Sequence, residues 1–147
     1  MTTMTEQTTQ VYAVFIKATP EQIWEAITTP SFTQKYFFGS HLTVTPELYD
    51  GRDADGNELV TGPVFDFDPP RRLSHGWTAL YDPTTASEPE SRVTWELEAQ
   101  DGGVTKLTVV HDKLEASPAT AQNVAGGWSF VLSGLKTLLE TGEPLQG

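Results

Sequence analysis

The stretch SPATAQNVAGGWSFVLSGLKTLLETGEPL, from Ser117 to Leu145, has the pattern of one long amphipathic helix. Apolar side chains recur in it at steps of three and four residues, which places them on one helical face. That face comprises Val124, Trp128, Val131, Leu135 and Leu138, widened by Leu132 and Leu139. Ser117 is expected to cap the start, with Pro118 first in the helix, and Gly142 to end it. We therefore expect a long helix with one buried face.

Three glycines inside this pattern, Gly126, Gly127 and Gly134, need an explanation. Each costs about 1 kcal/mol relative to alanine in a helix interior. A kink, or a close approach of the helix backbone to a sheet, would compensate for that cost. We favour tight packing on a sheet, and the alternative is space left for a ligand beside Trp128.

Most of the chain before this helix is predicted to be strand. Residues 10–17 alternate in polarity, and residues 73–81 alternate again along a longer strand. Two short strands are expected between residues 40 and 62, where turn residues are frequent. Residues 82–90, rich in Pro, Thr, Ser and Glu, are expected to form a solvent-exposed loop.

Two short helices are predicted after the first strand. Thr19 is a suitable helix cap, Pro20 suits the first helical position, and Gln22 can reach back to complete a capping box. This helix should end before Pro30, because the residue preceding a proline is pushed out of the helical region. A second short helix is expected over residues 31–36.

A hairpin around the loop 101–103 is the clearest local feature. A two-residue loop would place Leu107 opposite Glu96 and mix the polar and apolar faces. The three-residue loop instead pairs Leu107 with Leu97, so that one face is apolar throughout. The same register points His111 inward, towards the C-terminal helix.

These elements together indicate an α+β domain. We expect a curved antiparallel sheet of about six strands wrapped round the long C-terminal helix. The 147 residues are the length of one domain, which we place at residues 10–145 after a disordered lead-in at residues 1–9.

Composition and charge exclude several classes of function. The chain has no cysteine, which rules out disulfides, thiolate catalysis and thiolate-bound metals and fits a reducing cytoplasm. The first residues do not resemble a signal peptide, and no segment is long and apolar enough to span a membrane, so we expect a cytoplasmic protein. A net charge of −11 argues against nucleic acid as a partner, and Arg71-Arg72 is the only dense basic spot. The acidity indicates either solubility or a basic protein partner.

Four segments together resemble a known family. They are VFIKATPEQIWEAIT at 14–28, DPPRRL at 68–73, SRVTWEL at 91–97 and the stretch from Gly127-Trp128 to Gly142. The chain resembles, over about residues 10–145, the AHSA-type domain, named for homologues of the activator of the heat-shock ATPase. This domain lies within the START-related (SRPBCC), birch-allergen-like superfamily. The resemblance implies a helix-grip fold with a hydrophobic cavity between the sheet and the last helix. It implies no particular chemistry, since such relatives include lipid and polyketide carriers, cyclases and co-chaperone domains.

The three histidines, His41, His75 and His111, lie on separate predicted elements. Their spacing is not that of a metal site, and we predict neither a metal nor a cofactor. His75 and His111 are both expected to face the interior. Each is either a core histidine hydrogen-bonded to a neighbour or, for His111 above all, a general acid or base.

A small-molecule pocket is the function that the aromatic residues favour, since such pockets combine apolar walls with a few polar groups. The predicted lining residues are Trp24, Phe37, Phe38, Phe65, His75, Trp77, Tyr81, Trp95, His111, Trp128, Val131 and Leu132. Phe37-Phe38-Gly39 could gate the opening.

Three functions remain open from the sequence. The leading one is non-enzymatic binding of a hydrophobic ligand, such as a lipid, a polyketide or an aromatic molecule. The second is an enzyme of cyclase or hydrolase type that uses a cavity histidine. The third is a co-chaperone or protein-interaction module with an acidic surface, and a homodimer is also conceivable.

Overall fold

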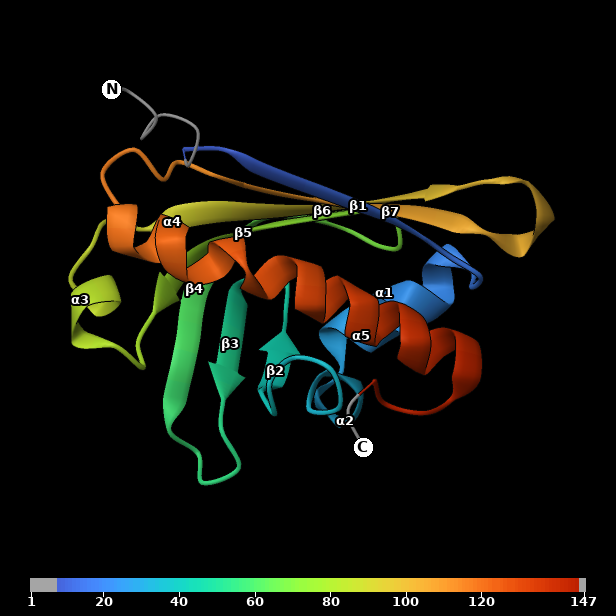
Figure 1. Cartoon of the computed structure of the whole chain (residues 1–147), viewed down its shortest axis with the longest axis horizontal. Coiled ribbons are helices and arrows are strands. Elements are labelled where there is room, and N and C mark those ends of the chain that lie inside the picture. Colours follow the sequence, from blue (N-terminus) through green and yellow to red (C-terminus); the bar gives the residue numbers. More distant parts are fainter. Residues whose placement is uncertain (1–7, 146–147) are drawn as a thin grey trace.

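A computed structural model describes residues 8–145 as one curved antiparallel sheet closed by helices (Figure 1). The elements in chain order are β1 (Gln10–Ile16), α1 (Pro20–Thr28), α2 (Pro30–Thr33), β2 (His41–Val44), β3 (Leu48–Arg52), β4 (Glu58–Asp68), β5 (Arg72–Ala79), α3 (Pro83–Ala86), β6 (Ser91–Ala99), the 3₁₀ turn η2 (Asp101–Gly103), β7 (Thr105–Asp112), α4 (Pro118–Ala125) and α5 (Gly127–Thr141). Residues 1–7 of the predicted lead-in, which was placed at residues 1–9, lie outside the described residues.

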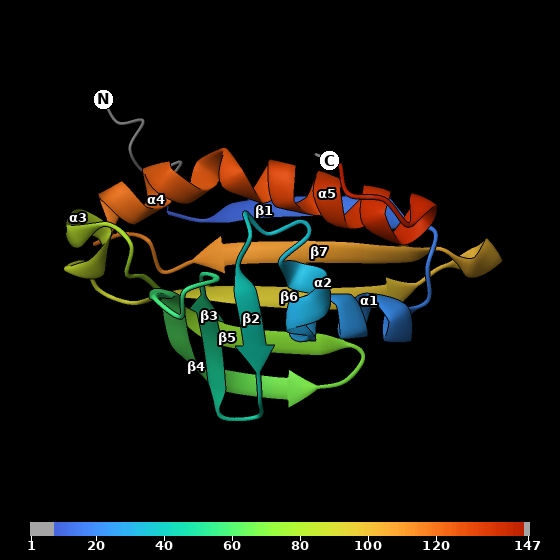
Figure 2. The ribbon, with the colours of Figure 1, turned by 90° about the horizontal axis from the view of Figure 1, so that it is seen from below.

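The sheet has seven strands in the order β1-β7-β6-β5-β4-β3-β2. Sequence analysis predicted about six. Residues 40–62, where two short strands were expected, form β2, β3 and the first part of β4. Figures 1 and 2 show the sheet bending, so that β2, β3 and β4 leave the plane of β1, β7 and β6 and curve round α4 and α5. The α+β helix-grip architecture is therefore confirmed.

The hairpin register is confirmed residue by residue. Leu97 pairs with Leu107, and Val93 pairs with His111. These leucines are buried, as is His111, so the apolar face of the hairpin lies against the helices. A three-residue loop thus fixes which side chains of β6 and β7 can reach the interior.

The predicted single C-terminal helix is wrong at Gly126, where the structure breaks into α4 and α5. Gly126 serves as the C-terminal cap of α4 and the N-terminal cap of α5. A Cβ atom added to Gly126 would have no neighbour within 4 Å, and one on Gly127 would meet only the Phe38 side chain, at 3.8 Å. Tight packing on the sheet is therefore not the reason for these two glycines.

Gly134 is the glycine that packs closely. A Cβ atom there would lie 3.1 Å from the Cβ of Tyr36, a residue of the segment after α2 rather than of the sheet. Tyr36 is buried, and its hydroxyl donates a 2.8 Å hydrogen bond to the carbonyl of Ala26. Gly134 thus lets α5 pack against this anchored tyrosine.

The start of α1 and the end of α5 follow the sequence signals, and the start of α4 does not. Thr19 and Gln22 form the expected capping box, and Gly142 ends α5 with φ 81°. Ser117, the predicted cap of α4, instead donates its hydroxyl to the carbonyl of Pro89 at 2.7 Å. The carboxylate of Glu88 takes over the cap, accepting hydrogen bonds from two backbone N–H groups of the first turn, at 2.9 and 2.8 Å.

Residues 82–90 are consequently more than a solvent loop. They form α3 and then bring Glu88 to the start of α4. Burial works against ionisation of Glu88, but its hydrogen bonds from Thr120 and Ala119 hold its pKa below the usual range. The second short helix also differs, since α2 spans Pro30–Thr33 rather than residues 31–36. No helix within residues 8–145 is long and apolar enough to cross a membrane.

Alanine substitution should separate the two kinds of glycine. Gly126→Ala places a methyl group in open space on helical backbone and should raise the free energy of unfolding by about 0.5–1 kcal/mol. Gly134→Ala should give no such gain, because Tyr36 must move to admit the methyl group. Urea denaturation of both variants checks this. A stabilising Gly134→Ala would contradict the close approach described above.

Candidate ligand pocket

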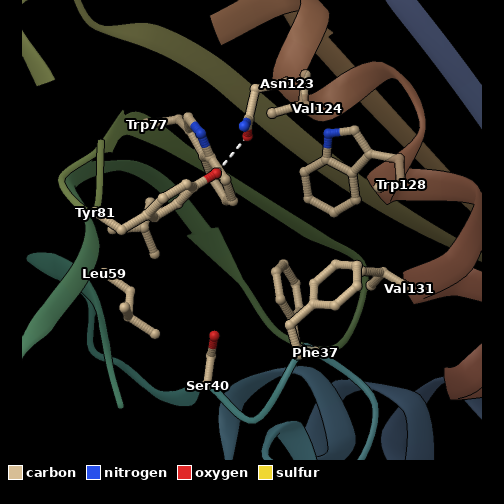
Figure 3. Close-up of a pocket in the computed structure, with 12 residues that line it drawn as sticks. Phe37, Ser40, Leu59, Trp77, Tyr81, Asn123, Val124, Trp128 and Val131 are labelled. Carbon is tan, nitrogen blue, oxygen red and sulfur yellow. Dashed lines mark hydrogen bonds between the residues drawn. The ribbon is translucent and has the colours of Figure 1, made fainter. Parts of the chain in front are cut away.

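A pocket of about 420 Å³ lies between the sheet and the break from α4 to α5 (Figure 3). It is lined by Phe37, Phe38, Ser40, Leu59, Val60, Trp77, Tyr81, Asn123, Val124, Gly127, Trp128 and Val131. None of these side chains carries a formal charge. The lining is thus aromatic and aliphatic, with a few neutral polar groups.

Trp128, on α5, forms one wall of the pocket and is tied to the sheet. Its indole Nε1 donates a 3.0 Å hydrogen bond to Nδ1 of His111 on β7. Because an indole can only donate, Nδ1 must be the acceptor and the imidazole proton lies on Nε2. That proton is donated to Ser91 Oγ, at 2.8 Å, and Ser91 Oγ in turn donates to the carbonyl of Trp77, at 3.2 Å. The chain of bonds joins two walls of the pocket.

A second indole and histidine form a parallel pair beside the first. Trp95 Nε1 donates to Nε2 of His75 at 3.0 Å, and His75 Nδ1 donates to the carbonyl of Gly76 at 2.8 Å. The ring of Tyr49 stacks on His75, with 3.6 Å between the centroids and 7° between the planes. The edge-to-face contact of Trp95 with Trp128, 5.4 Å between centroids, connects the two pairs.

Both histidines are fully buried, and each uses both ring nitrogens in hydrogen bonds of the neutral form. Burial lowers the pKa of His75 to about 3 and that of His111 to about 4, the latter against an opposing effect of Asp112. Protonation would place a second N–H against an indole N–H. The core-histidine interpretation fits this geometry, and the sealed position of His111 counts against its use as a general base.

One side of the pocket is bounded by a polar pair and an exposed aromatic residue. The Tyr81 hydroxyl donates to Oδ1 of Asn123, linking the segment after β5 to α4 (Figure 3). Phe38 is 64% exposed, has φ 53° and stacks on Phe130 at 5.5 Å. This left-handed backbone, rare for phenylalanine, holds an apolar ring at the surface beside the pocket.

The structure brings half of the predicted lining residues to the pocket. These are Phe37, Phe38, Trp77, Tyr81, Trp128 and Val131. His75, Trp95, His111 and Leu132 are buried in the core outside the lining.

Trp24 and Phe65 lie elsewhere. Trp24 packs edge-to-face on Phe67, with 5.4 Å between the centroids. Phe65 is 56% exposed beside a polar groove lined also by Arg72 and Arg92. The pairing of β4 with β5 shifts between Val64 and Asp66, so simple alternation along β4 does not give the side on which Phe65 lies.

Other lining residues were not predicted: Ser40, Leu59, Val60, Asn123, Val124 and Gly127. Two of them carried a signal, since Val124 belongs to the apolar stripe and Gly127 is costly in a helix. Asn123 carried none, because its contact with Tyr81 spans 42 residues of sequence. Leu59 and Val60 come from the stretch in which alternation is weakest.

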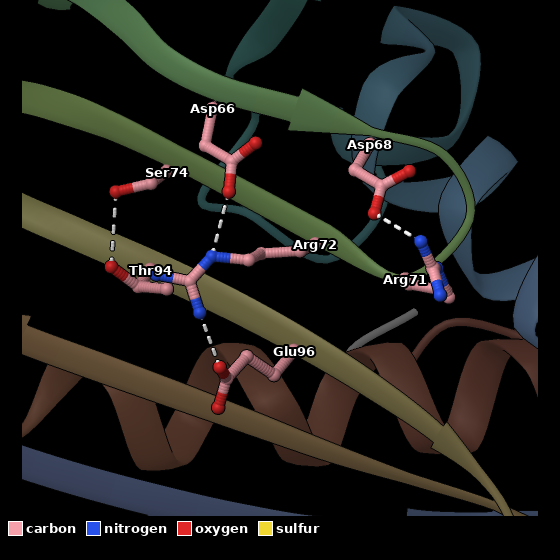
Figure 4. A network of polar contacts seen from close by, with 7 residues as sticks. All are labelled: Asp66, Asp68, Arg71, Arg72, Ser74, Thr94 and Glu96. Carbon is pink, nitrogen blue, oxygen red and sulfur yellow. Dashed lines mark hydrogen bonds and ion pairs between the residues drawn. The ribbon is translucent and has the colours of Figure 1, made fainter.

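The face of the sheet opposite α5 carries the charged side chains (Figure 4). Arg71 pairs with Asp68 at 2.7 Å, and Arg72 pairs with Asp66 at 2.8 Å and also with Glu96. The dense basic spot found in the sequence is therefore matched by carboxylates. Within residues 8–145 there is no cluster of three or more potential metal ligands.

Because His75 and His111 are neutral in the folded protein, the free energy of unfolding should depend on pH. As the pH falls below about 6.5, the unfolded chain binds protons that the folded protein cannot. The free energy of unfolding is therefore highest above that pH. On acidification each histidine should lower it by about 1.4 kcal/mol per pH unit. This loss continues to about pH 4 for His111 and about pH 3 for His75.

Replacing His111 by Asn tests this directly, because the amide oxygen can still accept from Trp128 but cannot titrate. Urea denaturation between pH 6 and 4.5 should show a slope about 1.4 kcal/mol per pH unit smaller than that of the wild type. Equal slopes would mean that His111 does not stay neutral in the folded protein. Carboxylate titration contributes to both proteins and cancels in the comparison.

Comparison with known proteins identifies the family. No curated protein matches the chain. The family model described as "Activator of Hsp90 ATPase homolog 1-like protein" matches residues 17–140.

Three solved structures illustrate the similarity. DynU16, from the dynemicin biosynthetic locus, is 26% identical with a TM-score of 0.73, over 93% of this chain and 49% of its own. A Rhodobacter sphaeroides protein is 28% identical with a TM-score of 0.66, over 93% and 95% of the two chains. The Aha1 dimer from Colwellia psychrerythraea shares the fold, at 18% identity and a TM-score of 0.71, over 95% and 98%. The chain therefore belongs to the activator of Hsp90 ATPase homolog 1-like family and has the helix-grip fold of the SRPBCC superfamily.

Proposed function

We propose that this protein binds a hydrophobic small molecule in the pocket between the sheet and the two C-terminal helices. The observation that carries the proposal is the pocket itself, about 420 Å³ in volume and walled mainly by aromatic and aliphatic side chains. Ligand pockets in proteins typically measure about 300–1,000 Å³ and have such a lining. The volume suits a molecule of two or three fused or linked rings.

The fixed position of the walls supports binding. Trp128 is held by His111, and the backbone of Trp77 is held through Ser91, so neither wall must become ordered when a ligand enters. A preformed site avoids part of the entropy cost of binding.

Gly127 supports the proposal from the helix side. It lines the pocket, and a Cβ atom there would meet only Phe38, another lining residue, at 3.8 Å. Because no tight packing requires this glycine, its cost to the helix is explained if the space serves a ligand. This is the alternative that the sequence left open for a glycine next to Trp128.

The relatives name no ligand. DynU16 comes from a biosynthetic locus, and this chain spans about half of its length. The Aha1 relative is a dimer, and a homodimer or a chaperone partner of this chain stays a prediction. The enzyme alternative also stays open, although it cannot rely on His111 in its present hydrogen bonds.

Titration with N-phenyl-1-naphthylamine, a neutral probe that fluoresces in apolar sites, tests the proposal. We expect a saturable rise in probe emission with a micromolar dissociation constant and quenching of tryptophan emission by energy transfer. Absence of saturable binding to the folded protein would overturn the proposed function.

The variant Gly127→Leu locates the site. The leucine should fill part of the pocket and weaken probe binding tenfold or more, while the protein remains at least as stable because a glycine leaves the helix. Gly126→Leu is the matched control, since this neighbouring glycine is exposed and does not line the pocket. Equal loss of binding in both variants would place the probe elsewhere.

A further inference from the structure

The lining of the pocket restricts the charge of its ligand. None of the nine lysines and arginines lines it, so no cation is present to pair with a buried carboxylate or sulfonate. An unpaired charge in an apolar site carries a large desolvation cost. The chain as a whole has a net charge of −11, which repels anions as they approach.

The surroundings of Tyr81 point the same way. Burial raises the pKa of Tyr81, its hydrogen bond with Asn123 opposes that rise, and the carboxylate of Asp82 adds to it. Burial is the larger cause, and Asp82 is the one charge that contributes. An anionic group placed beside Tyr81 would be repelled by that carboxylate.

Tyr81 and Asn123 are also a polar anchor with unused capacity. Since Tyr81 donates to Oδ1 of Asn123, the amide Nδ2 of Asn123 keeps both of its hydrogens, and no residue within 8–145 accepts from it. The phenol oxygen keeps its lone pairs for a donor. Trp77, Trp128 and Phe37 offer only rings to the same space, and Figure 3 shows Trp77 beside the polar pair, with Trp128 and Phe37 farther across.

Building on the proposed function, we propose that the ligand is an uncharged aromatic molecule with one hydrogen-bonding oxygen, held by Asn123 and Tyr81. The aromatic body lies between Trp77, Trp128 and Phe37, and the oxygen accepts from the Asn123 amide. Fatty acids and other organic anions should bind more weakly than uncharged molecules of the same shape. A phenol or a ketone on a ring system meets these requirements.

Two naphthylamine probes test the exclusion of anions. N-phenyl-1-naphthylamine and 8-anilino-1-naphthalenesulfonate share one ring skeleton and differ by the sulfonate. We expect the neutral probe to bind at least ten times more tightly at low salt. Equal affinities would overturn the charge selectivity while leaving the proposed function intact, whereas failure of both probes to bind would overturn the proposed function as well.

The anchor is tested by displacing the neutral probe with 2-naphthol or naphthalene. For each protein we divide the affinity for 2-naphthol by the affinity for naphthalene. This ratio should be about fivefold smaller in Asn123→Leu than in the wild type, which is the effect of losing one hydrogen bond. Gln122→Leu, an equivalent change at the adjacent exposed position, should keep the wild-type ratio. An unchanged ratio in Asn123→Leu would overturn the anchor. Circular dichroism verifies that both variants are folded.

Discussion

The hydrogen bond from Trp128 to His111 joins the two halves of this fold. A curved sheet closed by one helix leaves the helix position to nondirectional apolar contacts unless a polar bond fixes it. Here the indole of α5 reaches a buried imidazole of β7, and the chain of bonds continues through Ser91 to the backbone of β5. The imidazole must be neutral to accept this bond, so the interior has to stay free of charge. The pocket beside this hydrogen bond is likewise lined without charged side chains.

The break at Gly126 lies next to the pocket. A straight helix from Ser117 to Gly142 would keep one continuous line along the sheet. Two glycines in succession instead divide this stretch into α4 and α5, with Gly127 at the wall of the pocket. Hydrogen bonds of Glu88 and Ser117 hold the start of α4 against residues 82–90, which stabilises the position of α4. Gly134, by contrast, serves packing alone.

Local signals made much of the fold predictable. The capping box of Thr19 and the pairing of Leu97 with Leu107 follow from spacing and polarity within a few residues. The mouth of the pocket was not predictable in this way, because the contact of Tyr81 with Asn123 depends on how α4 is placed over the sheet. The exposure of Phe65 was not predictable for another reason. The register of β4 against β5 shifts at this residue, so strict alternation along the strand does not give the face on which it lies. Family resemblance supplied the architecture but not the ligand.

The account claims that Trp128 and Trp77 form the walls of a ligand site whose geometry exists before the ligand arrives. Four tryptophans provide separate indole N–H signals in a ¹⁵N-labelled sample, and Trp24, packed on Phe67 away from the pocket, is an internal reference. Addition of N-phenyl-1-naphthylamine should shift the Trp128 and Trp77 signals and leave that of Trp24 in place. A shift confined to Trp24, or a saturable probe that moves neither Trp128 nor Trp77, would contradict the account.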